Sequence, residues 1–236
     1  MKAGLEEKEI LILELIRSAP EPIGSWYIVN YLNEKGIRVS SATVGRVLNK
    51  LENQGYLQKE KFKGRVITEK GYQVIQYDHG LKQMADEQSK IVELIDHTQR
   101  SNLMNILNAR LAIEPQLAAI AAETAAPEDH QRMLECLQAA EQNHSLNKWV
   151  ADDSMSFHIA IAAASKNPIL ESFFKQLAIL MMQDMTFQLV IHQKSENELE
   201  GHWGVYNAIL AGDGPRAAAA MRSHIENLIR DVNTTG

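Results

Sequence analysis

The feature that most constrains the fold is a helical spacing of apolar residues that continues from Gln99 almost to the carboxyl end. Breaks rich in Pro, Gly and Asn divide this region, and no alternating strand pattern competes with it. The spacing predicts six helices, at about 99–125, 127–142, 149–165, 168–192, 196–211 and 214–231. Alanine-rich stretches permit close helix packing. We therefore expect residues 99–236 to form an all-helical bundle with room for an interior site.

The first third of the chain has a different pattern, with short amphipathic helices followed by a hairpin. Helices are expected at about 6–18, 25–36 and 40–55, the third capped by Ser40 or Ser41. A short hairpin with a basic tip follows over residues 56–67. This order is typical of a winged helix-turn-helix, so residues 1–71 are expected to form a DNA-binding domain. The predicted fold class is mainly α, with a small β-hairpin wing and a carboxy-terminal helical bundle.

Residues 72–98 are expected to link the two domains. Their apolar stripe is broken by charges, enough to pack against a neighbour but not to form a core. The sequence Asp78-His79-Gly80 predicts an interruption, with a second helix beginning near Leu81.

Small polar and basic side chains gather on the exposed face of the third helix and on the wing. A helix that begins with small polar residues can enter the major groove, while Lys and Arg beside it contact phosphates. Thr43 and Arg46 are the expected base readers. The full set of expected DNA-contacting residues is Ser41, Thr43, Arg46, Asn49, Lys50, Lys61, Lys63 and Arg65. Winged helices also serve as protein-contact modules, so the pattern leaves that alternative open.

Charge is divided unevenly along the chain. Residues 1–78 hold 12 Lys and Arg against 10 Asp and Glu, whereas residues 79–236 hold 12 against 20. A basic run can be a solvated face, so its position on the third helix and the wing is what favours nucleic acid.

Composition places the protein in a reducing compartment. The single cysteine, Cys136, allows no intrachain disulfide. No apolar run approaches the ~20 residues that span a bilayer, and the charged start of the chain lacks a signal-peptide core. We expect a cytoplasmic protein that does not associate with membranes.

Three histidines, His158, His202 and His224, each lie on the apolar stripe of a different predicted helix. Leu199 and Tyr206, for example, flank His202 at a spacing of about one turn. An imidazole among hydrocarbon needs a partner, and a divalent metal held by neutral nitrogens satisfies several at once. Taken singly, each histidine fits a hydrogen-bonded core residue better than a metal ligand, so the residues alone leave both interpretations open.

Several motifs occur in order along the helical region. They are Arg110 to Pro115, Phe157-His158 before Ser165 and Asn167, His202 before Gly212-Asp213, and Met221 with His224. Together they resemble the effector-binding (FCD) domain of FadR-type regulators in the GntR superfamily, over roughly residues 99–231. The resemblance implies a dimerising helical bundle that often holds Zn or Ni through one Asp and three His, and that binds small carboxylates at or beside the metal.

The resemblance implies a role for particular residues of this chain. The metal ligands would be His158, His202 and His224, and Arg110 would receive the effector carboxylate through its planar fork. Arg110 fits a structural salt bridge with Glu114 equally well. The family's metal-binding Asp lies one turn before the first histidine, where this chain has Ser154, expected to face the effector. Asp153 could replace that Asp only if its helix begins irregularly.

The amino-terminal module resembles a different group of proteins. The stretch from Ser40 to Gly71, with Ser41-Ala42-Thr43-Val44-Gly45-Arg46 and Thr68-Glu69-Lys70-Gly71, is similar to the winged helices of ribonuclease R and of nitrogen-regulatory repressors. It lacks the usual GntR reading-head sequence, so operator rules cannot be transferred.

These observations predict a ligand-responsive transcriptional regulator. It would act as a homodimer on a double-stranded DNA operator and sense a small organic acid through a buried divalent metal. In one alternative the metal itself is the signal. A three-histidine zinc enzyme is another alternative, but no acid, base or nucleophile is clearly placed for catalysis, so we expect no enzyme.

Overall fold

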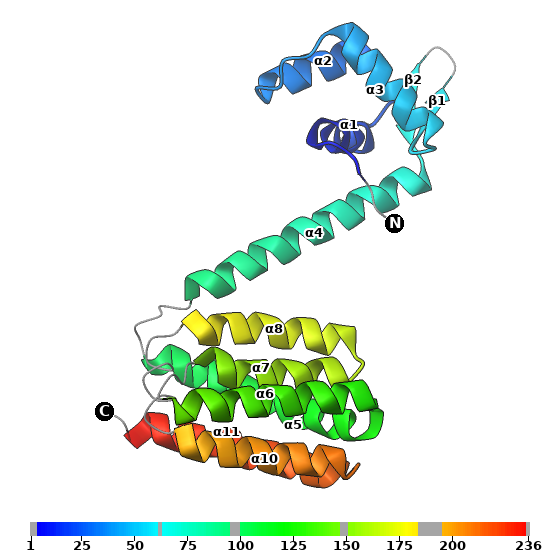
Figure 1. Ribbon diagram of the computed structural model, residues 1–236. Helices are drawn as coiled ribbons and strands as arrows, with labels where there is room; N and C mark the ends of the chain where they lie inside the picture. Colours follow the sequence, from blue (N-terminus) through cyan, green and yellow to red (C-terminus); the bar gives the residue numbers. More distant parts are fainter. Residues whose placement is uncertain (1–3, 61–62, 95–99, 147–150, 184–194, 235–236) are drawn as a thin grey trace. The chain divides into compact units, whose positions relative to one another are not determined.

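The computed structural model describes residues 4–60, 63–94, 100–146, 151–183 and 195–234 of the 236. The chain divides into two compact units, residues 1–91 and 92–236, and each is described by itself. Both are built from helices, joined in the first unit by a small antiparallel sheet (Figure 1). The predicted fold class is confirmed.

The first unit is a helix-turn-helix with a hairpin wing. Its elements are α1 (Glu7–Ser18), α2 (Ser25–Glu34), α3 (Ser41–Asn53), β1 (Leu57–Glu60), β2 (Gly64–Ile67) and α4 (Glu69–Leu94). The apolar faces of the helices meet in one core, in which Leu13, Ile28 and Leu51 are fully buried. The strands pair antiparallel, with Leu57 opposite Ile67.

Local chemistry explains how α3 and the second strand of the wing begin. Ser40 is the N-cap of α3, since its Oγ accepts a hydrogen bond from the amide of Thr43 at 3.2 Å. Ser41, the alternative cap, is instead the first residue of the helix. Gly64 has φ +127°, and a Cβ there would lie 2.5 Å from the carbonyl oxygen of Ile23. Only glycine fits that position.

Helix α4 runs from Glu69 to Leu94 without the interruption predicted at Asp78-His79-Gly80, so that prediction is wrong. Lys82 pairs with Asp78, one turn before it, at 2.9 Å. His79 also contacts Glu14 of α1. One glycine costs a helix only about 1 kcal/mol relative to alanine, a cost that contacts such as these can offset.

The second unit is a helical bundle. Its described elements are α5 (Arg100–Thr124), α6 (Pro127–Ser145), α7 (Ala151–Ala164), α8 (Pro168–Gln183), α10 (Ser195–Leu210) and α11 (Gly214–Thr234). Helix α5 packs against α7, α8, α10 and α11, which places its inward face at the centre of the bundle. Part of the helix predicted at 168–192 lies outside the described residues. Across the part of the chain that is described, no helix combines the length and the apolar content required to cross a membrane.

Candidate metal centre

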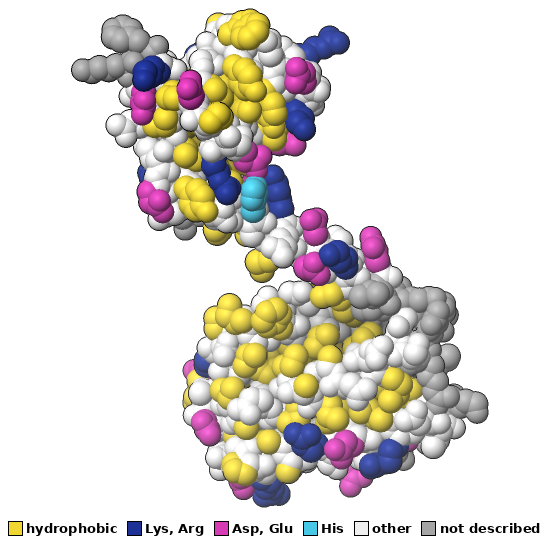
Figure 2. All heavy atoms as spheres, turned by 180° about the vertical axis from the view of Figure 1, so that it is seen from behind, with side chains coloured by type: hydrophobic (Ala, Val, Ile, Leu, Met, Phe, Trp, Pro, Cys, Tyr) yellow, Lys and Arg dark blue, Asp and Glu magenta, His cyan; other side chains and the backbone are white. Residues whose placement is uncertain are grey.

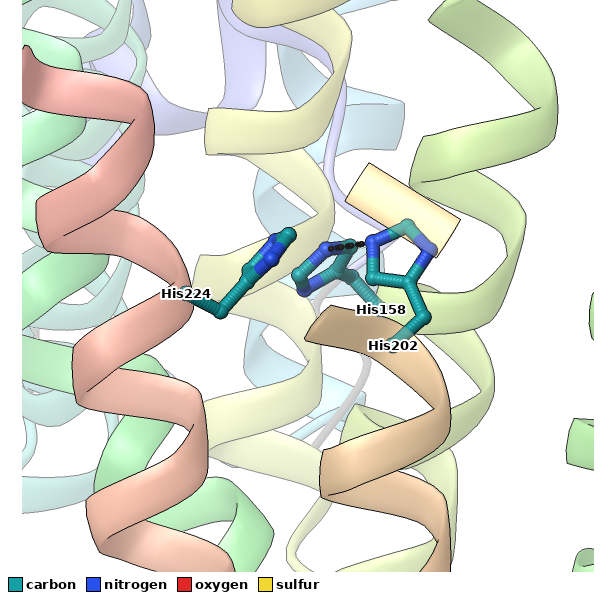
Figure 3. A group of neighbouring side chains, drawn as sticks. All are labelled: His158, His202 and His224. Carbon is teal, nitrogen blue, oxygen red and sulfur yellow. Dashed lines mark hydrogen bonds between the residues drawn. The ribbon is translucent and has the colours of Figure 1, made fainter. Parts of the chain in front are cut away.

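Three histidines from three helices converge inside the second unit (Figure 3). One nitrogen from each of His158 on α7, His202 on α10 and His224 on α11 lies within 4.8 Å of the others. The Nε2 atoms of His158 and His202 are 3.0 Å apart. All three side chains are buried, because the apolar residues one turn away on each helix belong to the core. The structure thus brings together the three histidines that the sequence singled out.

Helix α5 adds a buried ion pair beside this cluster. The Arg110 guanidinium donates from Nε to Glu114, and its Nη2 lies 3.3 Å from the second Glu114 oxygen. Burial acts to raise the pKa of Glu114, but the charges of Arg110 and His158 and their hydrogen bonds hold it at about 2. The salt bridge weighed as the structural role of Arg110 is therefore present. The Nη1 atom of Arg110 has no hydrogen-bond partner among the described residues.

Not every ring nitrogen of the three imidazoles has a hydrogen-bond partner. Nδ1 of His158 contacts the Glu114 carboxylate, so a proton on Nδ1 leaves Nε2 to accept from Nε2–H of His202. Within the described structure, Nδ1 of His202 and Nε2 of His224 are then left without a partner. A bound cation is one way to satisfy such lone pairs.

Burial also sets the protonation state of the cluster. Desolvation lowers the pKa of His158, and it lowers the pKa values of His202 and His224 well below the usual range. The neutral form is the one that ligates metal. Three neutral imidazoles suit Zn or Ni, so the donor set fits the ion that the family resemblance implies.

A second buried carboxylate, Glu198, lies on α10 one turn before His202. Its Oε2 is 3.8 Å from Nε2 of His202 and 3.7 Å from Nε2 of His224. The hydroxyl of Ser154 donates to the same oxygen at 3.4 Å. Burial raises the pKa of Glu198 to about 7. Sequence reasoning missed Glu198, although the four-residue spacing from His202 on an amphipathic helix was a usable signal.

Ser154 occupies the position where the family resemblance implies Asp. It is buried on α7, one turn before His158, as that position requires. Helix α7 is α-helical from Ala151, and the residues directly before it lie outside the described structure, so a role for Asp153 stays a prediction. The side chain of Asp153 itself lies outside the described structure.

Gly201 allows α11 to bring His224 against the backbone of α10. A Cβ at Gly201 would lie 2.6 Å from Nδ1 of His224, closer than real Cβ contacts. At Gly204, one turn further along the same helix, a Cβ would meet nothing within 4 Å. The missing side chain at Gly201 therefore helps to position the third imidazole.

The residues expected to contact DNA lie on α3 and the wing of the first unit. Ser41, Arg46, Asn49, Lys50 and Lys63 are exposed, Thr43 and Arg65 are half-buried, and Lys61 lies outside the described residues. The hydroxyl of Thr43 is 3.0 Å from that of its capping residue, Ser40. The expected surface is thus largely accessible.

Two of these cations are already paired within the protein. Arg65 donates from Nη2 to Asn49 at 2.7 Å and from Nε to Glu52 at 3.1 Å, which ties the wing to α3. Lys50 pairs with the buried Glu9 at 2.6 Å. The side chains of Arg46 and Lys63 make no hydrogen bond or ion pair with another described residue, so their charges are open to a ligand.

Comparison with known proteins places the second unit in a family. The FCD domain family matches residues 105–227, just over half of the chain. The chain belongs to the FCD domain family. The HTH-type transcriptional regulator LutR of Bacillus subtilis is 24% identical over 203 residues, which cover 84% of this chain and 86% of LutR. An Escherichia coli protein described provisionally as the L-lactate dehydrogenase operon regulatory protein is 33% identical over 125 residues, 51% of this chain and 48% of that protein.

The remaining comparisons concern the first unit and the fold of this FCD protein. The ribonuclease R winged-helix domain matches residues 10–75, which confirms the resemblance of the amino-terminal module. The solved structure of Streptococcus agalactiae GntR shares the fold, with a TM-score of 0.50 at 19% identity, covering 95% of this chain and 98% of that one. The chain is therefore a DNA-binding transcriptional regulator of the GntR/FCD type, which confirms the regulator class over the enzyme alternative.

Proposed function

We propose that this FCD regulator holds one Zn or Ni ion through His158, His202 and His224 and alters its DNA binding when a small organic acid binds beside the ion. The convergence of three buried imidazoles carries the proposal, and two of them, His202 and His224, keep a ring nitrogen without a hydrogen-bond partner among the described residues. A metal held by three imidazoles keeps at least one open position, which a carboxylate can fill. The name of the Escherichia coli relative refers to an L-lactate dehydrogenase operon, and lactate is a small carboxylate, which supports an effector of that class.

Arg110 is the proposed receptor of the acid. Its Nη2 lies 3.3 Å from both ring nitrogens of His158, and its Nη1 lacks a partner among the described residues. A buried donor without a partner costs free energy, and an effector carboxylate would satisfy it. Ser154 is the second proposed polar contact, because its buried hydroxyl lies in the same interior.

The proposed regulator acts on DNA as a homodimer in the cytoplasm. Ser41, Thr43, Arg46 and Asn49 would face base edges, and the cations of α3 and the wing would contact phosphates. Hydrophobic side chains gather on the face of the second unit that Figure 2 shows. Ile169, Phe173 and Ile179 of α8 are each more than half exposed, which supports association with another copy. Effector binding would then change the separation of two DNA-binding heads.

Metal content measured by elemental mass spectrometry tests the proposal. Purified protein is expected to carry about one Zn or Ni ion per chain, which His202→Ala removes and His79→Ala, at an exposed histidine of the first unit, retains. Absence of metal from the wild type, even after loading, overturns the metal site. In the loaded protein, DNA affinity that responds to the metal but to no carboxylate makes the metal the signal instead.

A further inference from the structure

We infer that Glu198 supplies the carboxylate of the metal centre that Ser154 cannot, so that this ligand comes from α10 instead of α7. The inference rests on the proposed metal site and adds a fourth protein residue to it.

The same spacing occurs on two helices of the site. Ser154 lies four residues before His158 on α7, and Glu198 lies four residues before His202 on α10. Side chains four apart lie on the same face of a helix, and both Ser154 and Glu198 are buried, at 1% and 4% exposure. A carboxylate four residues before the histidine is thus absent from α7, where Ser154 lies, and present on α10.

The distances are close to those of ligands that share an ion. Metal bonds of about 2.0–2.2 Å place neighbouring ligand atoms roughly 3 to 3.5 Å apart. Oε2 of Glu198 lies 3.8 Å from Nε2 of His202 and 3.7 Å from Nε2 of His224. The latter nitrogen has no hydrogen-bond partner in the described structure. A movement of a few tenths of an ångström would bring Oε2 of Glu198 to coordination spacing from each of these two nitrogens.

The charge of Glu198 is unmatched without a metal. Glu114, the other buried carboxylate of this interior, pairs with Arg110. Among the described residues, the only basic groups within 4 Å of the Glu198 oxygens are His202 and His224. A buried carboxylate is stabilised by a cation or a metal, and a divalent ion here would supply that charge. The hydroxyl of Ser154, which donates to Oε2, then becomes an outer hydrogen bond that orients the ligand.

Zinc affinity of the full chain, measured by competition with a chromophoric chelator, tests the assignment. Glu198→Gln, which keeps the shape and removes the charge, is expected to bind Zn²⁺ at least about 10-fold more weakly than the wild type. Ser154→Ala removes only the outer hydrogen bond and is expected to have the smaller effect. Moving the carboxylate back to α7, in the double variant Glu198→Gln with Ser154→Asp, is expected to restore most of the affinity. The visible spectrum of the Co²⁺-loaded protein should differ between the wild type and Glu198→Gln, because it reports the ligand set.

The outcomes separate this inference from the proposed function. Wild-type Zn²⁺ affinity and an unchanged Co²⁺ spectrum in Glu198→Gln overturn the role of Glu198 and leave the three-histidine site intact. A wild type that binds no Zn²⁺ overturns the proposed metal site itself. Circular dichroism checks folding, and if Glu198→Gln does not fold, the folded double variant decides: failure to bind Zn²⁺ there contradicts the inference.

Discussion

The two units of this regulator differ in how many charged side chains they bury. Among its described residues, the winged-helix unit buries one charged side chain, Glu9, whose carboxylate pairs with a Lys50 that is 45% exposed. The helical unit buries Arg110, Glu114 and Glu198 together with three histidines. Burying ions costs several kcal/mol unless they are well paired or coordinated. The second interior therefore carries a cost in stability that the first does not, as expected if the helical unit holds the proposed site.

The same contrast separates the two carboxylates of the helical unit. Both are buried, but Arg110 and His158 hold the pKa of Glu114 at about 2, whereas burial raises that of Glu198 to about 7. The two pKa values differ because the Arg110 guanidinium pairs with Glu114, whereas no Arg or Lys among the described residues pairs with Glu198. Glu114 is satisfied within the protein and positions Arg110 and His158, while Glu198 remains available to a ligand.

The largest expected effect comes from removing the cation of a buried pair. Arg110→Met leaves the Glu114 carboxylate buried without its partner and should lower the free energy of unfolding by about 3–5 kcal/mol. Lys50→Met is the matched change in the first unit and should have a far smaller effect, because the Lys50 ammonium is largely solvated. Urea denaturation of the metal-free protein measures both. Equal losses would remove the contrast between the units.

The second-largest expected effect is a pH-dependent change in stability caused by Glu198. In the metal-free protein the pKa of Glu198 is raised from 4.5 to about 7, so the folded state loses stability as the pH rises through that range. Glu198→Gln removes this loss and should be more stable than the wild type by up to about 3 kcal/mol at pH 8, and nearly equal to it at pH 4.5.

Thermal unfolding of both metal-free proteins across this pH range measures the difference. Both carry the same histidines, whose lowered pKa values destabilise each protein as the pH falls below about 6.5, so the comparison isolates Glu198. Saturating Zn²⁺ should reverse the order of stability at pH 8. A constant difference between the proteins at every pH would contradict the assigned pKa.

Two glycines of α10 offer a smaller and sharper test of the packing around His224. Gly201→Ala places a methyl group against the ring and should destabilise the protein by about 1–3 kcal/mol, with weaker metal binding. Gly204→Ala meets open space in the same helix and should stabilise it by about 0.5–1 kcal/mol. Thermal unfolding of the two variants measures the direction of the change in stability, and zinc titration measures the change in affinity. Equal effects would show that the ring does not depend on close approach at Gly201.

The smallest effect concerns the first unit and its DNA. Lys63 has no ion-pair partner among the described residues, whereas Lys50 shares its charge with Glu9. On a duplex selected from random DNA, Lys63→Ala should therefore reduce the slope of log affinity against log salt by about one, and Lys50→Ala by less. Fluorescence anisotropy at several salt concentrations measures both slopes. A larger reduction of the slope for Lys50→Ala would mean that the Lys50 ammonium leaves Glu9 and contacts a phosphate when DNA binds.

Much of the secondary structure followed from local spacing. The helix predicted at 127–142 is observed as Pro127–Ser145, because the proline start and the apolar spacing are properties of neighbouring residues. The interruption predicted at Asp78-His79-Gly80 is wrong, and one of the contacts that support α4 there, between His79 and Glu14 of α1, joins residues 65 positions apart. A local pattern contains no information about such a contact.

The candidate site likewise has features that follow from single helices and features that depend on how the helices pack. The sequence by itself determined that three histidines would turn inward, since their positions on apolar stripes are properties of single helices. Only the tertiary structure decided that Glu198 lies beside His224 and accepts a hydrogen bond from Ser154, 44 residues before it in the chain. That arrangement depends on the depth at which α7, α10 and α11 pack against one another, partly through the close approach at Gly201. Apolar periodicity specifies which face of a helix is buried but leaves open how far the helix slides along its neighbours, and this axial register selects the residues that meet in the interior.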